Sequence, residues 1–312
     1  MRLPRLLLCS TLCLFSHAPT LAQNATDDGF AAAVQIGGYN VKPNVTYLTA
    51  SGRDLKLDVY EPSPATSATP VVINFHGGGW VAGSREGSLL KLLPYMQMGF
   101  AVVNVEYRLA KTALAPAAVE DTLCALQWVG RNAKQYNFDL SKVVVTGGSA
   151  GGHLALATAM IPSDSPFTNQ CALHGSWSGP YVNPAPKVAA VINWFGITDV
   201  ADMLQGPNVR SYAVAWFGAM DGRMELARRL SPLSYVRKDG PAVLTIHGDA
   251  DPLVPYAHAV RLRQAMDKAG EKNQLLTIKG GGHGDFTPEQ NQQAYQAVRD
   301  FLRGMGIVAP PK

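Results

Sequence analysis

Short apolar runs recur along the chain and alternate with stretches whose apolar residues have helical spacing. The runs are rich in β-branched residues and occupy residues 71–75, 100–105, 143–145, 188–194, 242–246 and 275–278. Between two of them, Val119, Leu123, Leu126 and Gly130 recur at i, i+4, i+7 and i+11, which predicts the buried face of a helix. Strands without polar alternation are typical of a parallel sheet covered by helices on both faces. The pattern therefore predicts an α/β fold with a mostly parallel, doubly wound sheet.

The start of the chain has a different pattern. Residues 44–48 and 55–60 are two short runs around a polar turn at 51–54, and apolar and polar residues alternate along the second run. Such alternation is typical of a half-exposed antiparallel strand, so we expect a hairpin at one edge of the sheet. Residues 23–43 are small and polar, which predicts a flexible lead-in.

Helices are expected at 85–98, 256–269 and 294–302, and they continue the alternation of strands and helices. One segment interrupts this alternation. Residues 199–240 separate two predicted strands by about 40 residues, which is longer than a usual crossover. We expect this stretch to be a cap-like insertion that folds over the carboxyl edge of the sheet. The remainder has no room for a second domain, so residues 44–312 are predicted to form a single one.

The first residues have the organisation of a secretory signal. Arg2 and Arg5 precede an apolar stretch at 6–15, and small residues at 20–22 follow. We expect a signal peptide over 1–22 with cleavage after Ala22, and a secreted or periplasmic protein. No later segment approaches 18 consecutive apolar residues, so no membrane span is predicted.

Composition and charge narrow the class of partner. The 312 residues are 47% hydrophobic and 16% charged, which fits a globular enzyme with a sizeable core. The formal charge of +4 falls to about +2 without Arg2 and Arg5, too little to indicate nucleic acid as a partner. After removal of the signal, Cys124 and Cys171 are the remaining cysteines. They either pair in an oxidising compartment or are two buried thiols, and the sequence favours neither.

The candidate chemistry begins at residues 147–151, Gly-Gly-Ser-Ala-Gly, which have the form G-x-S-x-G. They follow a predicted buried strand and precede a small-residue stretch that predicts a helix. A serine at such a sharp turn has its hydroxyl exposed at the carboxyl end of the sheet. The motif alone is a weak signal, because a tight glycine turn with an incidental serine reads the same way. Support for a catalytic role of this serine must therefore come from a base and an acid elsewhere in the chain.

Two later loops hold suitable partners for Ser149. The strand at 242–246 runs into a loop with Asp249 and Asp251, and the strand at 275–278 runs into a glycine loop with His283. The order Ser149, Asp251, His283 is the order of nucleophile, acid and base in this architecture. His283 is the expected base, Asp251 is preferred to Asp249 as the acid, and His153 and His247 are expected to be packing residues.

A turn of consecutive glycines follows the strand at 71–75. In His76-Gly77-Gly78-Gly79-Trp80, glycines allow backbone N–H groups to face a substrate without obstruction by side chains. Together with the amide of Ala150, backbone amides from residues 76–79 are predicted to form an oxyanion hole.

Five segments resemble the α/β-hydrolase esterases: HGGGW, EYRLA, PAAVEDTLCALQWV, GGSAGGHLAL and HGDADPLVP. The resemblance runs from about residue 44 to 304 and is greatest to the group that contains acetyl-xylan and feruloyl esterases, next to the hormone-sensitive-lipase-like carboxylesterases. It implies an α/β-hydrolase fold, with Ser149 as nucleophile, Asp251 as acid and His283 as base. The implied amide donors are those of Gly78, Gly79 and Ala150.

The chain departs from the lipase-like pattern at two points. Those enzymes usually read GDSAGG, where this chain has Gly148, and they have a helical N-terminal cap that is missing before the first predicted strand here. A more open site is expected, with the insertion as one wall. The aromatic candidates for the substrate pocket are Trp80, Tyr212, Trp216 and Phe217, for which plain core packing is the alternative.

The sequence thus predicts a serine carboxylesterase without metal or organic cofactor that acts on short-chain or carbohydrate-linked acetyl or feruloyl esters. The substrate would be a small molecule or a polysaccharide ester, and oligomeric state is left open. An aryl-formamidase and a serine peptidase on the same fold are alternative enzymes. A hydrolase fold that binds without catalysis is the alternative outside enzymes.

Overall fold

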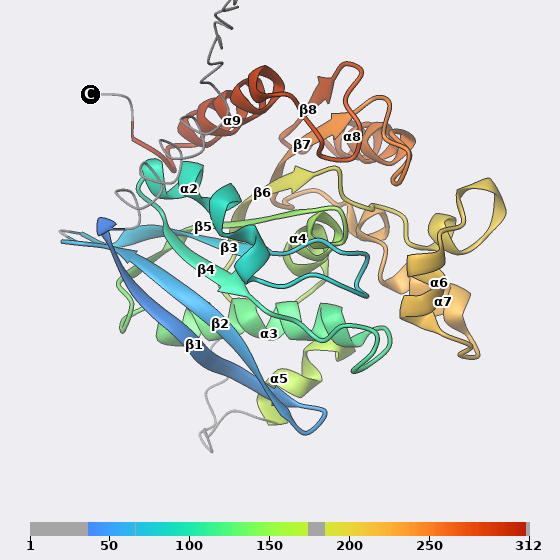
Figure 1. Ribbon diagram of the computed structural model, residues 1–312, viewed down its shortest axis with the longest axis horizontal. Helices are drawn as coiled ribbons and strands as arrows, with labels where there is room; N and C mark the ends of the chain where they lie inside the picture. The colour runs from blue at the N-terminus through green and yellow to red at the C-terminus, as the bar shows by residue number, and fades with distance from the viewer. Residues whose placement is uncertain (1–36, 66, 174–184, 310–312) are drawn as a thin grey trace, which may run out of the picture.

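The central feature is one twisted sheet of eight strands. The computed structural model describes residues 37–65, 67–173 and 185–309, and within these the strand order is β1-β2-β4-β3-β5-β6-β7-β8 (Figure 1). The strands are β1 (Tyr39–Ala50), β2 (Arg53–Pro62), β3 (Thr69–Phe75), β4 (Ala101–Val105), β5 (Phe138–Gly148), β6 (Val188–Trp194), β7 (Ala242–Gly248) and β8 (Asn273–Ile278). β1 and β2 are antiparallel to their neighbours, and all later pairs are parallel. The predicted α/β fold, with a hairpin at its edge, is confirmed.

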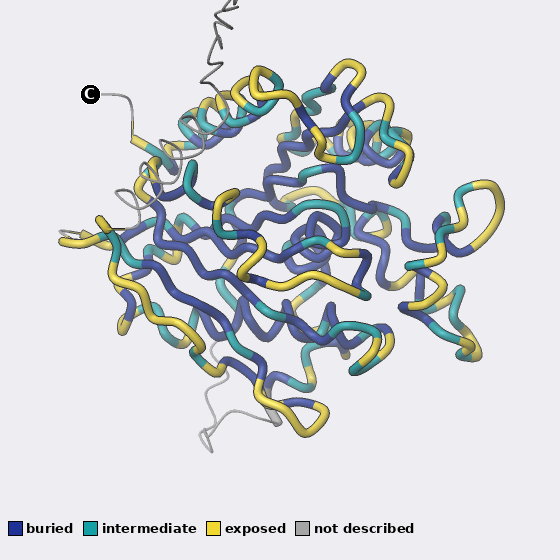
Figure 2. The backbone as a smooth tube through the Cα atoms, viewed as in Figure 1, coloured by how far each residue is buried: buried dark blue, intermediate teal, exposed yellow. Residues whose placement is uncertain are grey.

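Helices cover both faces of this sheet. They are α2 (Leu89–Gln97), α3 (Ala117–Asn132), α4 (Ala150–Met160), α8 (Ala257–Ala269) and α9 (Pro288–Arg303). Alternate residues of a strand point to opposite faces. Val71 and Ile73 accordingly lie in the core that includes α3 and α4, whereas Val72 lies in the core that includes α2 and α9. The inner strands are buried along almost their whole length (Figure 2).

Element boundaries differ from expectation where strand pairing extends an element. β1 begins at Tyr39, five residues before the predicted 44 and inside the predicted lead-in, because Tyr39 already pairs with Pro62 of β2. β5 is much longer than the predicted 143–145, since its first residues pair with the start of β3. The remaining lead-in before residue 37 and the predicted signal peptide with its cleavage after Ala22 lie outside the described residues.

The insertion at 199–240 is a series of short helices beyond the carboxyl ends of the strands (Figure 1). These are η3 (Ala201–Leu204), η4 (Gly206–Asn208), α6 (Ser211–Phe217), α7 (Arg223–Arg229) and η5 (Pro232–Tyr235). Trp216 and Phe217 of α6 are fully buried in the core shared with α4. Arg261 of α8 binds two carboxylates of the insertion, Asp199 at 3.1 Å and Asp202 at 2.7 Å. The insertion is therefore packed and hydrogen-bonded to the main domain.

A disulfide links Cys124 of α3 to Cys171 of α5 (Asn169–Leu173), 47 residues later. The sequence leaves open whether the two cysteines pair, and in the structure they form a disulfide.

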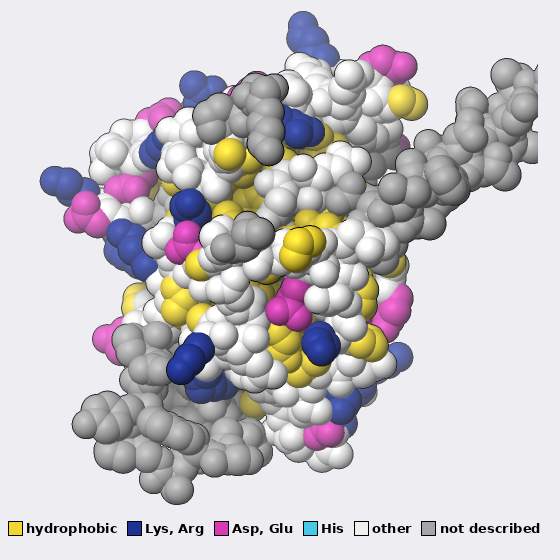
Figure 3. All heavy atoms as spheres, turned by 90° about the vertical axis from the view of Figure 1, so that its left-hand side faces the viewer, with side chains coloured by type: hydrophobic (Ala, Val, Ile, Leu, Met, Phe, Trp, Pro, Cys, Tyr) yellow, Lys and Arg dark blue, Asp and Glu magenta, His cyan; other side chains and the backbone are white. Residues whose placement is uncertain are grey.

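No helix among the described residues is both long enough and apolar enough to cross a membrane. On the face shown in Figure 3, basic and acidic side chains are interspersed around a central group of hydrophobic ones.

Candidate active site

The turn that presents Ser149 is a tight junction between β5 and α4. Ser149 has φ 59° and ψ −122°, an unusual conformation for a residue with a side chain. The flanking glycines make it possible. A Cβ atom on Gly147 or Gly151 would overlap the carbonyl oxygen of Phe75, because the end of β3 passes directly beside the turn. The structure thus explains both glycines of the motif by close backbone approach.

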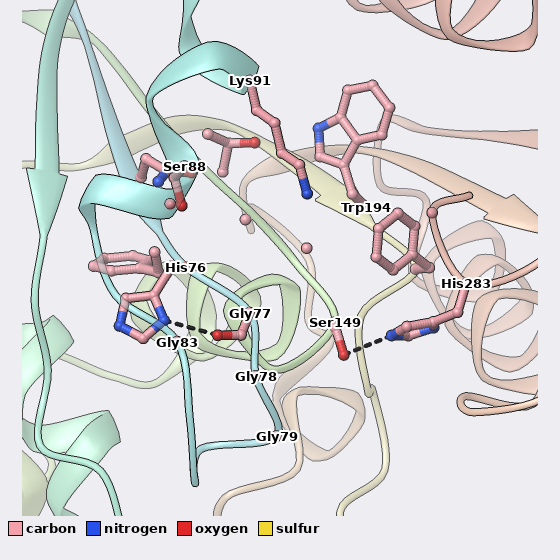
Figure 4. Close-up of a pocket in the computed structure, with 18 of the residues that line it drawn as sticks. His76, Gly77, Gly78, Gly79, Gly83, Ser88, Lys91, Ser149, Trp194 and His283 are labelled. Atoms are coloured by element: carbon pink, nitrogen blue, oxygen red, sulfur yellow. Dashed lines mark hydrogen bonds between the residues drawn. The ribbon is translucent and has the colours of Figure 1, made fainter. Parts of the chain in front are cut away.

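Ser149, His283 and Asp251 form a continuous hydrogen-bonded chain, although they come from three distant segments. The Ser149 hydroxyl lies 2.8 Å from Nε2 of His283 (Figure 4), and Nδ1 of the same ring lies 2.7 Å from Oδ2 of Asp251. An ionised carboxylate only accepts hydrogen bonds, so Nδ1 carries the proton and donates it. Nε2 is then left as the acceptor for the serine hydroxyl. This arrangement can move a proton from Ser149 to His283.

Asp251 is fixed by donors on both carboxylate oxygens. The amides of Leu253 and Val254 donate to Oδ1 at 2.8 and 2.9 Å, while Nε2 of His247 lies 3.1 Å from Oδ2. Burial by itself raises the pKa of this carboxyl group. The hydrogen bonds from His247, His283 and the Val254 amide outweigh burial and hold the pKa of Asp251 well below its usual range. The group is therefore a permanent anion beside the ring of His283.

Asp249, the alternative acid, has a different place in the same loop. It is exposed, and its Oδ1 accepts a hydrogen bond of 2.6 Å from the amide of Gly280. The bond ties the loop after β7 to the loop after β8. Geometry therefore separates two aspartates that lie only two residues apart: Asp251 contacts His283, and Asp249 holds the loops together.

His153 and His247 are packed inside the protein, as expected. Nδ1 of His153 accepts a hydrogen bond of 3.2 Å from the Trp80 indole, and its Nε2 donates to the carbonyl of Leu230 at 2.8 Å. Complete burial lowers the pKa of His153 to about 4. His247 is also fully buried, and its Nε2 lies 3.0 Å from the carbonyl oxygen of Val254. Neither ring faces Ser149.

The glycine turn after β3 lies beside the Ser149 turn. Gly78 and Gly79 have φ values of 117° and 59°, and the carbonyl of Gly78 accepts hydrogen bonds from the amides of Val81 and Ala82. Both glycines line the same cavity as Ser149. Ala150 is the first residue of α4, where an amide has no partner within the helix. Gly78, Gly79 and Ser149 thus line one cavity, and Ala150 directly follows the serine at the start of α4.

A cavity of about 620 Å³ opens above these groups. Tyr212 lines it, as expected, but Trp80, Trp216 and Phe217 do not, and the expectation for these three is corrected. Trp80 and Trp216 are fully buried and stacked on each other, with ring centroids 4.1 Å apart, and Phe217 packs edge-on against Trp216. These three side chains bury their apolar surface between the insertion and the main domain, so they are part of the hydrophobic core and not of the pocket.

One known family matches the central part of the chain. The model of the family described as BD-FAE matches residues 57–266, which is more than half of the chain and runs from the middle of β2 through most of α8. The chain belongs to the BD-FAE family.

Named relatives of this BD-FAE protein include esterases and also non-reducing polyketide synthases, of which the match covers 14% of the length. It is 26% identical to Esterase LipQ of Mycobacterium tuberculosis (strain ATCC 25618 / H37Rv), over 80% of this chain and 59% of LipQ. It is 27% identical to Esterase LipC of the same organism, over 70% of this chain and 54% of LipC. The chain thus spans a little over half the length of these curated relatives.

Solved structures with the same fold include esterases as well. A truncated form of a carbohydrate esterase from gut microbiota has 31% identity and a TM-score of 0.70, with 86% of this chain and 97% of that chain covered. An esterase from the Planctomycetes species Thermogutta terrifontis, solved with propionate bound, has 25% identity and a TM-score of 0.72, with 89% and 98% covered. The fold of this BD-FAE protein is the α/β-hydrolase fold.

Several residues of the cavity have no sequence motif to mark them. They lie on α2, on α9 and at the end of β6, and they are Ser88, Lys91, Tyr95, Trp194, Phe195, Phe286 and Tyr295. Trp194 and Phe195 could have been proposed, because they end a predicted strand whose carboxyl edge faces the site. The helical residues could not, since they lie far from any motif.

Phe195 shows why this BD-FAE protein has Gly148 before the serine. A Cβ atom on Gly148 would lie 3.2 Å from the tip of the Phe195 ring, so a larger residue would displace that ring. The same ring packs edge-on against His283, with centroids 4.8 Å apart. Phe195 thus fills the space beside the serine and supports the imidazole.

Within the described residues, no group of three or more His, Cys, Asp or Glu side chains is placed to hold a metal ion.

Proposed function

We propose that this protein is a serine carboxylesterase that works through an acyl-enzyme. The observation that carries the proposal is the chain of two short hydrogen bonds from Ser149 through His283 to Asp251, beside a glycine turn that lines the same cavity. Membership of the BD-FAE family and the esterase names of the relatives support it.

Acylation uses the imidazole as a base. Oγ of Ser149 attacks the ester carbonyl carbon while its proton moves to Nε2 of His283, and Asp251 stabilises the imidazolium that forms. The carbonyl electron pair moves onto oxygen, where the amides of Gly78, Gly79 and Ala150 donate hydrogen bonds. Collapse of this tetrahedral intermediate breaks the bond to the alcohol, which leaves with the proton from Nε2.

Deacylation repeats these steps with water as the nucleophile. Nε2 of His283 takes a proton from the water as its oxygen attacks the acyl carbon. The second tetrahedral intermediate then releases the carboxylic acid, and the proton on Nε2 returns to Oγ of Ser149. Each group ends in its starting state, and no redox partner or metal is needed for the balance.

Short-chain and carbohydrate-linked acetyl or feruloyl esters are the proposed substrates. The cavity of about 620 Å³ has room for an aromatic group, and aromatic side chains form much of its lining. A carbohydrate esterase among the similar structures supports the carbohydrate-linked class. Acetate release from acetylated xylan and ferulate release from methyl ferulate would be compared with hydrolysis of 4-nitrophenyl acetate and butyrate.

The test against other enzyme classes uses matched leaving groups. We expect wild-type protein to hydrolyse 4-nitrophenyl butyrate at least about a hundredfold faster, in kcat/KM, than alanine 4-nitroanilide or a formanilide, and Ser149→Ala to lose nearly all of this activity with the fold intact. Preference for the anilide would favour a peptidase, and preference for the formanilide would favour a formamidase. Undiminished ester hydrolysis by purified Ser149→Ala would contradict the proposal.

We also propose that the protein is exported, with the signal over 1–22 removed after Ala22. The Cys124–Cys171 disulfide supports an oxidising compartment, because such bonds are rare in the reducing cytosol. Expression of the full chain in a secreting bacterial host, followed by N-terminal sequencing, would test this. A mature protein that begins at Gln23 outside the cytoplasm is expected, whereas a product that keeps Met1 in the cytosol would contradict it.

A further inference from the structure

The cavity has a second wall, which contains neither Ser149 nor His283. It is formed by the first turns of α2, by the end of β6 and by α9, and the residues from these elements are Ser88, Lys91, Leu92, Tyr95, Trp194, Asn291 and Tyr295. Figure 4 shows the Lys91 side chain running from α2 into the space between Ser88 and Trp194. This wall takes no part in the proposed proton transfers.

Lys91 gives this wall a positive charge that nothing in the lining balances. Among all the described residues that line the cavity, Lys91 is the only Lys, Arg, Asp or Glu. None of the ion pairs found within residues 37–65, 67–173 and 185–309 includes it. A lysine ammonium is a strong donor of hydrogen bonds to carboxylates. Its charge is therefore available to a substrate.

Ser88 adds a second polar group at the same place. It precedes α2 as its N-cap residue and is only 8% exposed, yet its side chain makes no capping hydrogen bond to the helix. A serine in this position ordinarily satisfies a backbone amide of the first turn. Here the hydroxyl belongs to the cavity lining, next to a helix N-terminus where negative charge is favoured.

The aromatic residues of this wall are held in place by hydrogen bonds within the protein. The Tyr95 hydroxyl lies 3.1 Å from the Thr146 hydroxyl and accepts a hydrogen bond of 3.3 Å from the Trp194 indole, so both polar ends are satisfied within the protein. The Tyr295 hydroxyl donates to the backbone carbonyl of Lys91 at 3.1 Å. The faces left toward the cavity are aromatic surfaces, which bind flat or apolar groups.

We propose that this wall selects esters that carry a carboxylate, with the carboxylate bound by Lys91 and Ser88 and the apolar part of the same group against Trp194 and Tyr295. The inference rests on the proposed ester hydrolysis at Ser149 and goes beyond it, because it assigns a charge to the substrate. The carboxylate can lie on the acyl group or on the alcohol, and the experiment distinguishes the two.

The experiment compares pairs of substrates that differ only in charge. For the acyl group, the mono-4-nitrophenyl esters of adipic and suberic acid are each paired with the neutral monoamide. For the alcohol, 4-acetoxybenzoate is paired with 4-acetoxybenzamide. The measured quantity is the ratio of kcat/KM for the anionic ester to kcat/KM for its neutral partner. We expect this ratio to exceed one for at least one pair, and to fall when salt is raised.

Variants of Lys91 then test the cause. Lys91→Met should lower the ratio about tenfold, mainly through KM, because it removes a hydrogen bond to a charged group. Lys91→Glu should lower it further, and Lys91→Arg should restore most of it. Lys268→Met is the control, since Lys268 is an exposed lysine on α8 that does not line the cavity.

The outcomes separate this inference from the proposed function. Hydrolysis of the neutral esters by wild-type protein, lost in Ser149→Ala, reports the esterase activity alone. A charge ratio at or below one for every pair would overturn the inference while leaving the esterase in place. A ratio above one that is unchanged in both Lys91→Met and Lys91→Glu would overturn it as well, because the selectivity would then come from elsewhere.

Discussion

The two walls of the cavity differ in what their polar groups contact. On the wall with Ser149, the polar side chains bond to one another: Ser149 to His283, His283 to Asp251, and Asp251 to His247 and two backbone amides. On the wall with Lys91, the ammonium joins no ion pair among the described residues, and the Ser88 side chain makes no capping hydrogen bond. The polar groups of the first wall are therefore hydrogen-bonded to one another before a substrate binds, whereas those of the second wall would find their partners on the substrate.

This difference matches what each wall has to do. Proton transfer needs groups held in one geometry, and hydrogen bonds inside the protein supply that order in advance. Selection between substrates needs groups that exchange water for the ligand, so their donors must be free beforehand. The comparison predicts that substitutions in the first wall reduce turnover on every ester, while those in the second change which ester is preferred.

The largest effect is expected from Asp251→Asn. The substitution keeps the size of the side chain but removes the anion that fixes the His283 tautomer, and kcat should fall by about 10⁴-fold on charged and neutral esters alike. Asp249→Asn is the matched control on the same loop. It should change kcat by less than about fivefold, because Asp249 contacts Gly280 and not His283. Equal losses in the two variants would refute the assignment of Asp251.

Acid should weaken the packing behind the first wall through His153. Burial lowers the pKa of His153 to about 4, so the folded protein keeps the ring neutral while the unfolded chain takes up a proton near pH 6.5. The unfolded state therefore binds more protons, and this group's contribution to stability is lost as pH falls from about 6.5 to about 4. The linked change is on the order of 3 kcal/mol.

Denaturant unfolding at pH 7, 5 and 4 measures this loss. The decline should be shallower in His153→Gln, whose side chain does not titrate, even if that variant is less stable at pH 7. The same slope in both proteins would show that His153 is not a source of the acid sensitivity.

A smaller effect on turnover is expected from His247. Its Nε2 lies 3.1 Å from the carboxylate oxygen of Asp251 that also binds His283. Loss of this contact in His247→Leu should lower kcat/KM about tenfold for all esters, because one of the bonds that keep Asp251 ionised is gone. His247→Gln retains a donor of similar reach and should recover part of the activity. Wild-type kinetics in His247→Leu would mean that the amides of Leu253 and Val254 suffice.

The smallest effect is expected on the second wall from Tyr295→Phe. The substitution removes the hydrogen bond from Tyr295 to the backbone of Lys91 and leaves the aromatic ring in the cavity. The charge ratio defined for the paired esters should fall about twofold to fivefold, and hydrolysis of the neutral esters should change less than the ratio does. A large loss on all esters would place Tyr295 with the first wall and break the comparison.

The sequence predicted most of the first wall because its features are local. Glycines around Ser149 are required by close backbone approach at the end of β3, and loops after successive parallel strands must meet at one edge of the sheet. The fold class and the order of the functional loops follow from such local rules, whereas position alone did not exclude Asp249 and the resemblance to esterases pointed to Asp251. The starts of β1 at Tyr39 and of β5 at Phe138 could not be predicted in this way, because they depend on pairing with strand residues distant in the sequence.

Tertiary packing explains what the sequence could not supply. Trp80, Trp216 and Phe217 were candidates for the pocket because of their type and position, but their rings meet in the core between the insertion and the main domain. Lys91 had no motif, and only the packing of α2 and α9 places its side chain in the cavity. The disulfide likewise required the position of α5 beside α3.

Covalent labelling tests the central claim most directly. Purified protein would react with a fluorophosphonate, and the modified peptide would be identified by mass spectrometry with remaining esterase activity followed in parallel. The account predicts one adduct per chain, on Ser149, whose formation parallels the loss of activity and becomes much slower in His283→Gln. Activity that survives full modification of Ser149, or inactivation with the adduct on another residue, would contradict it.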